Sequence, residues 1–253
     1  MGAGRRAAAR LLTRSSHFLL ELVPAVLRPD DFLALAREAY DRERAYDRGL
    51  GPAVEQGLSP QEAELIDPLG PGSALCVGCG PGRELVALAR RGFKVVGTDW
   101  SAGQVERARA RLHQEWPDAE VVQAEADRLP LEGRRFDLVC LLGSVYAHVP
   151  GRPGRVRLLR EVGGALAPAG AAVLDFYLDP AARRARTFPL VKAAAWVTGG
   201  HRAIEAGDVM LADVFLHRHR DADQLAGEVR ESGLVADHVV VQGHRGWTRL
   251  RRP

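Results

Sequence analysis

Residues 73–84, Ser-Ala-Leu-Cys-Val-Gly-Cys-Gly-Pro-Gly-Arg-Glu, decide the fold of this chain of 253 residues. A short apolar run leads directly into Gly78, Gly80 and Gly82, and a helical pattern follows from Glu84 to Arg91. Strand, glycine turn and helix together form the opening unit of a nucleotide-binding α/β sheet. Glycine permits the positive φ angles of such a turn and lets a ligand approach the backbone closely. The start of the helix adds N–H groups without intrahelical partners and the positive end of the helix dipole.

The glycine spacing argues against a dinucleotide as the ligand. A dinucleotide fingerprint requires G-x-G-x-x-G, and its third glycine would fall on Arg83. The spacing present in the chain is G-x-G-x-G instead. A Rossmann oxidoreductase that uses NAD is therefore not favoured.

Strands and helices alternate after this unit, which indicates a parallel sheet. The expected strands span residues 94–99, 119–125, 136–142 and 171–177, and the expected helices span 101–115, 155–166 and 223–232. Two last strands, 235–241 and 247–251, flank a turn bounded by glycines and predict an antiparallel hairpin. The sequence thus predicts an α/β fold with a doubly wound, mostly parallel, seven-stranded sheet and an antiparallel C-terminal hairpin.

Two segments lie outside this alternating pattern. Residues 1–70 predict an N-terminal helical cap, with Ser59 as the cap of one of its helices, and the sheet domain then covers 71–253. Residues 178–220 are too long for a simple connection, and an extra strand is expected within 207–217. Because long insertions at the carboxyl edge of a sheet often cover an active site, we expect this one to act as a lid.

A carboxylate ends the second predicted strand, 21 residues beyond Gly78. This carboxylate, Asp99, is placed to accept hydrogen bonds from both ribose hydroxyls of a bound nucleoside. Trp100 follows directly, and it either lies flat on an adenine ring or packs as an ordinary core residue.

These features and three later stretches resemble class I S-adenosylmethionine-dependent methyltransferases. Residues 124–130, A-E-A-D-R-L-P, resemble the family pattern G-D-A-x-x-L-P. Residues 136–139, F-D-L-V, resemble its fourth strand, and residues 158–170 resemble its L-x-x-E…L-x-P-G-G stretch. The resemblance covers 73–177 well and the C-terminal hairpin loosely. It implies a Rossmann-like methyltransferase fold, methyltransferase activity and S-adenosylmethionine as the cofactor.

The resemblance also implies which residues contact the cofactor. Its acidic position after the third strand falls on Glu125 because Leu129 sets the register, with Asp127 as the competing candidate. The residues expected to bind the cofactor are Gly78, Cys79, Gly80, Gly82, Asp99, Trp100, Glu125, Ala126, Leu142 and Gly143.

Two positions depart from the family pattern. Cys76 stands where members carry an acid that helps to hold the methionine ammonium, and Glu84 in the first helical turn is a possible substitute. Ala169 replaces one glycine of the L-x-P-G-G turn, which we interpret as a structural change.

The catalytic candidates follow the fourth strand, where family members place residues that face the substrate. His148 is the first of them, since its unperturbed pKa near 6.5 suits proton removal at neutral pH. The alternative is that His148 only bonds a backbone carbonyl and pins the loop. Tyr146 is the second candidate, and His217 and His219 are lesser ones.

Three functions remain open, and the first is favoured. It is methyl transfer by in-line displacement to a small-molecule nucleophile, whose reacting atom is oxygen, nitrogen or carbon. The second is methylation of RNA, and the third is a non-catalytic nucleotide-binding domain. The arginines that favour RNA are Arg152, Arg155, Arg157, Arg160, Arg183, Arg184 and Arg186. Nucleic acid is not the expected partner, because arginine is abundant throughout the chain and no RNA-binding module is visible.

Composition adds few further constraints. The net charge is +3, and all but two of the 35 basic residues are arginine, which is typical of GC-rich codon usage. Cys76 and Cys79 have the spacing of a metal or redox pair, but no second ligand pair accompanies them, so no metal is expected. No uncharged apolar run reaches the ~18 residues that a membrane span needs. We expect a cytoplasmic protein without a membrane partner; the oligomeric state is not indicated.

Overall fold

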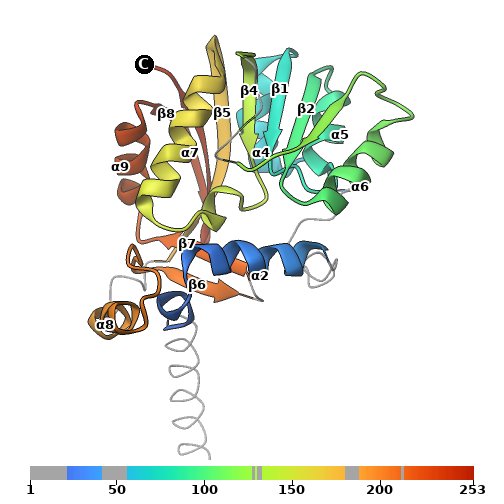
Figure 1. Cartoon of the computed structure of the whole chain (residues 1–253). Helices are drawn as coiled ribbons and strands as arrows, with labels where there is room; N and C mark the ends of the chain where they lie inside the picture. Colours follow the sequence, from blue (N-terminus) through green and yellow to red (C-terminus); the bar gives the residue numbers. More distant parts are fainter. Residues whose placement is uncertain (1–21, 42–55, 127–128, 130–132, 180–187, 212–213) are drawn as a thin grey trace, which may run out of the picture.

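The computed structural model describes residues 22–41, 56–126, 129, 133–179, 188–211 and 214–253 (Figure 1). Its helices are α2 (Pro29–Asp41), α4 (Pro60–Ile66), α5 (Arg83–Ala89), α6 (Ala102–Leu112), α7 (Arg152–Ala165), α8 (Phe188–Thr198) and α9 (Ala222–Ser232), with 3-10 turns η2 (Asp67–Leu69) and η3 (Tyr146–His148). Its strands are β1 (Ser73–Val77), β2 (Lys94–Asp99), β3 (Glu120–Gln123), β4 (Phe136–Leu141), β5 (Leu166–Leu178), β6 (Asp208–Leu211), β7 (Val214–His219), β8 (Val235–Gln242) and β9 (Arg245–Arg251).

The sheet is mostly parallel, as the sequence predicts. Its order is β3-β2-β1-β4-β5-β7-β6, with β9 paired to β5 and β8 paired to β9. The pairs β1–β2, β1–β4, β2–β3, β4–β5 and β5–β7 are parallel. Strand β9 runs antiparallel to both β5 and β8. The predicted α/β class and the antiparallel C-terminal hairpin are therefore confirmed.

The number of strands is a correction. The described residues form a sheet of nine strands, whereas the sequence predicts seven. The two additional strands come from the insertion, in which the sequence predicts one extra strand within 207–217. This stretch forms the antiparallel pair β6–β7, and β7 joins β5 through the pairs Tyr177–Arg218 and Leu178–His219. The division was not visible in the sequence because residues 208–217 contain no glycine or proline to mark a turn.

Helices cover both faces of the sheet (Figure 1). Successive residues of β1 point to opposite faces, so Cys76 packs in one apolar cluster and Leu75 in the other. The first cluster takes its helical residues from α4, α5 and α6, and the second takes them from α7 and α9. This alternation produces the doubly wound arrangement with helices on both faces.

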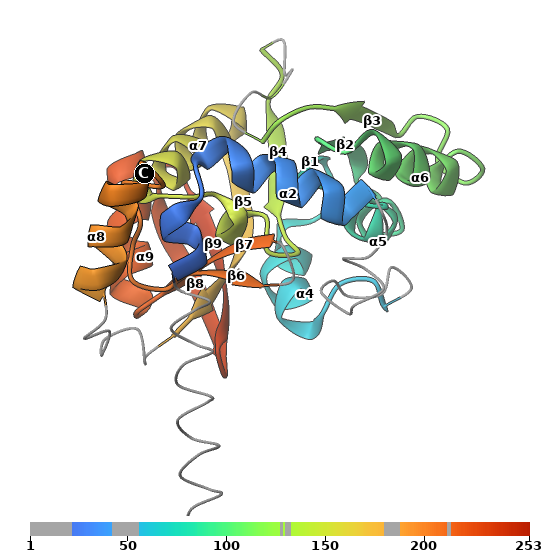
Figure 2. The same ribbon diagram turned by 60° about the horizontal axis from the view of Figure 1, so that its bottom comes forward.

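The described part of the predicted cap contributes two helices near the sheet. Ser59 caps α4, since its hydroxyl accepts from the Glu62 N–H and the Glu62 carboxylate accepts from the Ser59 N–H at 2.7 Å. Helix α2 lies across the edge of the sheet, in front of β1 and β4 in Figure 2. Residues 1–21 and 42–55 of the cap lie outside the described residues. Within the described ranges, no helix has the length and apolar character to cross a bilayer.

Candidate functional site

The glycine turn after β1 has the backbone that only glycine adopts easily. Gly78, Gly80 and Gly82 have φ angles of +65°, +51° and +95°, and Gly82 caps the start of α5. A Cβ on Gly78 would stand 2.5 Å from a methyl carbon of Val145, which is closer than side chains approach. The turn therefore needs glycine both for its backbone and for the close approach of the loop after β4.

Asp99 ends β2 beside this turn and holds it. Its carboxylate accepts from the Gly80 N–H at 2.8 Å and from the Ser101 N–H at 2.9 Å. The side chain is buried, yet it borders a cavity. Because a carboxylate oxygen can accept more than one hydrogen bond, its place on the cavity wall suits contact with a ligand hydroxyl.

The cavity lies at the carboxyl edge of the sheet and has a volume of about 360 Å³. This size falls within the range of small-molecule sites. One side is formed by the glycine turn and the ends of β2 and β3, and the other by η3, α7, α2 and β7. Its lining includes Asp30, Phe32, Gly78, Gly80, Asp99, Trp100, Gln104, Glu125, Ala126, Gly143, Val145, His148, Val149, Arg157, Leu158, Val214 and Phe215.

Most residues predicted to bind the cofactor meet at this cavity. Those that line it are Gly78, Gly80, Asp99, Trp100, Glu125, Ala126 and Gly143. The other three do not: Cys79 and Leu142 pack in the core, and Gly82 begins α5. Glu125 is exposed at the rim, and its competitor Asp127 lies outside the described residues.

The loop after β4 is held in a strained conformation. Ser144 has a φ of +77°, which is the only positive value among the described residues other than glycine. Its N–H donates to Asp175 at 3.0 Å, and its hydroxyl bonds to that of Tyr177 at 2.8 Å. Arg245 in turn donates to Asp175 at 2.7 Å. These bonds fix the loop from which Gly143 and Val145 face the cavity.

His148 lines the cavity in a defined protonation state. Its Nδ1 lies 2.7 Å from the carbonyl oxygen of Phe215. Because a carbonyl only accepts, Nδ1 carries the proton, and Nε2 of the neutral ring carries the lone pair. Burial lowers the pKa of His148 below its ordinary value of 6.5, against the opposing effect of the Phe215 carbonyl. The ring is therefore neutral at pH 7, and Nε2 is the atom able to take a proton.

Tyr146, the other main catalytic candidate, does not line the cavity. Its side chain is fully buried, and its hydroxyl donates to Glu228. The lesser candidates His217 and His219 are also fully buried and away from the cavity lining. The structure thus brings His148, alone among these four, to the cavity.

Glu84, the possible substitute for the acid missing at Cys76, lies one layer behind the cavity wall. Its Oε1 would be 3.8 Å from a Cβ placed on Gly143. It pairs with Arg83 at 2.6 Å, and Arg83 also pairs with Glu62 at 2.7 Å. Burial raises the pKa of Glu84, although Arg83 opposes the shift. Glu84 is therefore engaged by Arg83 and does not line the cavity.

Several cavity residues were not predicted individually from the sequence. Phe32 comes from α2, and Val214 and Phe215 come from β7. The rings of Phe32 and Phe215 are in contact, with centroids 4.9 Å apart. The amphipathic pattern of α2 marks a buried face, but it does not indicate what that face covers.

Comparisons with known proteins identify the class. Residues 74–170 match a family model described as a methyltransferase domain. A structure of 1,6-didemethyltoxoflavin-N1-methyltransferase from Burkholderia thailandensis, with S-adenosylhomocysteine bound, superposes with a TM-score of 0.64 at 16% identity, covering 88% of this chain and 90% of that one. An S-adenosylmethionine-dependent methyltransferase from Methanosarcina mazei superposes with a TM-score of 0.62 at 18% identity, covering 78% and 98%.

A relative in sequence is an uncharacterised 37.1 kDa protein encoded in transposon TN4556 of Streptomyces fradiae. It is 32% identical over an alignment of 154 residues, and the alignment covers 54% of this chain and 44% of that protein's length. The family predicted from the sequence is confirmed for this domain: residues 74–170 match the methyltransferase family model, and the fold is that of S-adenosylmethionine-dependent methyltransferases. The predicted enzyme class, a methyltransferase, agrees with this family match. The predicted cofactor, S-adenosylmethionine, agrees with the S-adenosylhomocysteine bound in the Burkholderia neighbour.

Proposed function

We propose that the protein transfers a methyl group from S-adenosylmethionine, held in the 360 Å³ cavity, to a small-molecule acceptor, with His148 as the base. The observation that carries the proposal is that the glycine turn, Asp99 and His148 line one space. The α2 and β7 segments border the same space, which supports the predicted role of the insertion as a lid that excludes water and suggests the same role for the cap.

The residues of the cavity suit the parts of the cofactor. Gly78 and Gly80 line the cavity without a side chain, so a ligand can approach their backbone closely. Asp99 would accept from the ribose hydroxyls, Trp100 would face the adenine ring, and Glu125 would accept from the adenine amino group. When bound, the cofactor supplies a methyl group already activated on a sulfonium, so little covalent chemistry remains for the protein.

The other side of the cavity suits an acceptor with an apolar surface. Phe32, Val149, Val214 and Phe215 form an apolar wall beside His148. The Burkholderia neighbour acts on 1,6-didemethyltoxoflavin, which supports a small-molecule acceptor in this fold. Orientation of the reactants can contribute up to about 7–11 kcal/mol. His148 Nε2 would remove the proton of an acceptor O–H, N–H or acidic C–H. Such base catalysis raises the reaction rate by roughly 10²–10⁴-fold.

Three of the four described arginines that favour RNA are engaged within the protein. Arg152 pairs with Glu231 at 3.0 Å, and Arg155 is fully buried. Arg160 donates to a backbone carbonyl of α9. Arg183, Arg184 and Arg186 lie outside the described residues. RNA methylation is therefore kept as the second candidate.

Incubation with methyl-labelled S-adenosylmethionine tests the proposal. One sample receives a small-molecule extract and another receives structured RNA at 150 mM salt. We expect label in a small molecule and none in RNA, because phosphate binding by a few arginines weakens steeply with salt. Label in RNA would favour the second candidate. Cofactor binding without label in either sample would favour a non-catalytic domain.

A further inference from the structure

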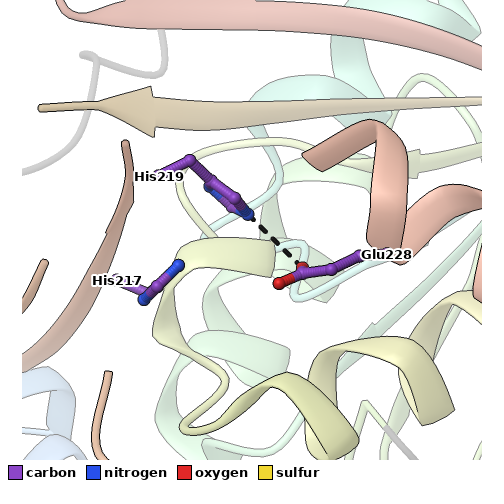
Figure 3. Close-up of side chains that lie close together, drawn as sticks. All are labelled: His217, His219 and Glu228. Atoms are coloured by element: carbon purple, nitrogen blue, oxygen red, sulfur yellow. Dashed lines mark hydrogen bonds and ion pairs between the residues drawn. The ribbon is translucent and has the colours of Figure 1, made fainter. Parts of the chain in front are cut away.

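A group of charged and titratable side chains is buried behind the cavity, between α7, α9 and the β6–β7 pair. They are Tyr146, Arg155, Asp208, His217, His219 and Glu228. Figure 3 shows His217 and His219 projecting from β7 and Glu228 reaching towards them from α9. None of these six residues lines the cavity, so the proposed mechanism leaves them without a role.

Glu228 is the centre of this group. Its carboxylate accepts from the Tyr146 hydroxyl, from Arg155 Nη2 at 2.6 Å and Nε at 3.0 Å, and from His219 Nε2 at 3.3 Å. Burial alone would raise the pKa of Glu228, but the bonds from His219 and Arg155 outweigh burial and lower it strongly. Glu228 is therefore an anion with both of its oxygens occupied by donors.

A metal ion is one explanation for such a group. Ligand atoms of His217, His219 and Glu228 lie within 4.8 Å of one another. The Arg155 guanidinium, however, already bonds both oxygens of Glu228 and pairs with Glu205 at 2.5 Å. A divalent cation at the same carboxylate would stand against a buried positive charge, which is costly in a medium of low dielectric constant. The guanidinium therefore takes the place that a metal would need.

The two other partners of Glu228 belong to the two segments that hold His148. Tyr146 begins η3, the turn that ends at His148. His219 ends β7, the strand in which Phe215 accepts the Nδ1–H of His148. The Tyr146 and His219 rings also stack, with centroids 5.9 Å apart and planes inclined by 3°. One carboxylate thus fastens η3 and β7 together beside the base.

We propose that Tyr146 and Glu228 are positioning residues for His148. Their hydrogen bond holds η3 against β7, and this contact keeps the His148 ring in the orientation in which Nδ1 donates to Phe215 and Nε2 serves as the base. The inference rests on the proposed function of His148 and deepens it. It also makes Tyr146 a positioning residue, whereas the sequence predicts a catalytic one.

The protonation state of Tyr146 agrees with this role. Burial and the neighbouring charge of Glu228 raise the pKa of the Tyr146 hydroxyl well above its ordinary value. The hydroxyl therefore keeps its proton at neutral pH and acts as a donor. A phenolate that could take a proton from an acceptor molecule is not formed there.

The variant Tyr146→Phe removes this one donor and little else. Glu228 keeps its bonds to Arg155 and His219, and the ring remains to stack on His219, so the variant is expected to fold. The matched control is Thr248→Val, which removes a fully buried hydroxyl that donates to the His238 carbonyl at 3.0 Å in β8. Both variants lose one buried hydrogen bond, but only the first loses it beside His148.

The measurement is nitrogen NMR of protein labelled at its eight histidines, with the His148→Gln spectrum used to identify His148. In the wild type, we expect one protonated nitrogen, Nδ1, and one unprotonated nitrogen, Nε2. In Tyr146→Phe, we expect the two signals to move towards each other as the tautomers interconvert, and in Thr248→Val we expect the wild-type pattern. Once an acceptor is identified, Tyr146→Phe should lower kcat on the order of tenfold, less than the ~10²-fold that a 1 Å misplacement costs, with KM for the cofactor unchanged.

Three other results would contradict the account in different ways. A wild-type His148 pattern in Tyr146→Phe, together with a lowered Tm like that of Thr248→Val, would overturn the inference and leave the base intact. A wild-type His148 already averaged between tautomers would overturn the base itself, and the inference with it. A stoichiometric metal ion that is lost in His219→Asn would make Glu228 a ligand and overturn the positioning role.

Discussion

Replacing His148 with glutamine is expected to lower turnover by about 10²-fold or more while cofactor affinity stays unchanged. Glutamine keeps a polar amide at this position, although it does not reproduce the Nδ1–H that meets the Phe215 carbonyl. It cannot take a proton, because an amide is not basic near neutral pH. The fall in kcat therefore measures the contribution of the base, while calorimetry with S-adenosylhomocysteine checks that the cavity is intact.

The pH profile gives the same prediction a second test. His148 acts as a base only when neutral, so activity falls as pH drops through its pKa. Burial holds that pKa below 6.5, so the acid limb is expected below pH 6.5, and His148→Gln should abolish it. His238→Gln is the matched control, since His238 is exposed and pairs with Glu64 far from the cavity. Near-normal turnover of His148→Gln with a lowered Tm would make His148 a residue that only pins the loop.

The variant Asp99→Ala is expected to weaken cofactor binding by roughly 1–3 kcal/mol, or about 5–150-fold. Two effects act together. The variant removes the carboxylate that would accept from the ribose, and it leaves the N–H groups of Gly80 and Ser101 without their acceptor. Calorimetric titration with S-adenosylhomocysteine measures the loss directly.

Asp137→Ala provides a matched control at the opposite edge of the sheet. Asp137 lies near the start of β4 and accepts from the N–H and the hydroxyl of Ser73, each at 2.8 Å. Like Asp99, it joins two neighbouring strands, but it does not line the cavity. We expect Asp137→Ala to lower stability and leave cofactor affinity as in the wild type. Equal loss of affinity in both variants would show that Asp99 acts only through the fold.

The parts of the molecule that local chemistry determines could be predicted from the sequence. The turn at Gly78–Gly82 follows from the need for positive φ angles, and Asp99 follows from its place at the end of a strand behind that turn. Ser59 marks the start of α4 because its side chain accepts from the first turn of that helix. Gly233 marks the end of α9 because it adopts the left-handed conformation that ends a helix.

The walls of the cavity could not be predicted in the same way, because they depend on contacts between distant segments. Phe32 reaches Phe215 across more than 180 positions, and nothing near either residue specifies the other. Tyr146 illustrates the same limit. Its place after the fourth strand indicates a catalytic residue, but its environment is set by Glu228, 82 positions away.

The predicted seven strands differ from the nine observed for a related reason. The hydrophobic pattern of residues 208–217 is compatible with one long strand or with a hairpin, and pairing with the end of β5 selects the hairpin. That pairing places Phe215 beside His148, so the same long-range contact that escaped prediction also completes the site.

The central claim is that the cavity beside Gly78 and Asp99 binds S-adenosylmethionine, and calorimetric titration of the wild-type protein tests it most directly. Separate titrations with S-adenosylmethionine, S-adenosylhomocysteine and NAD are compared at the same protein concentration. We predict binding of the first two in the micromolar range and no heat of binding for NAD, because Arg83 occupies the third glycine position of a dinucleotide site. Binding of NAD without a response to S-adenosylmethionine would contradict the account.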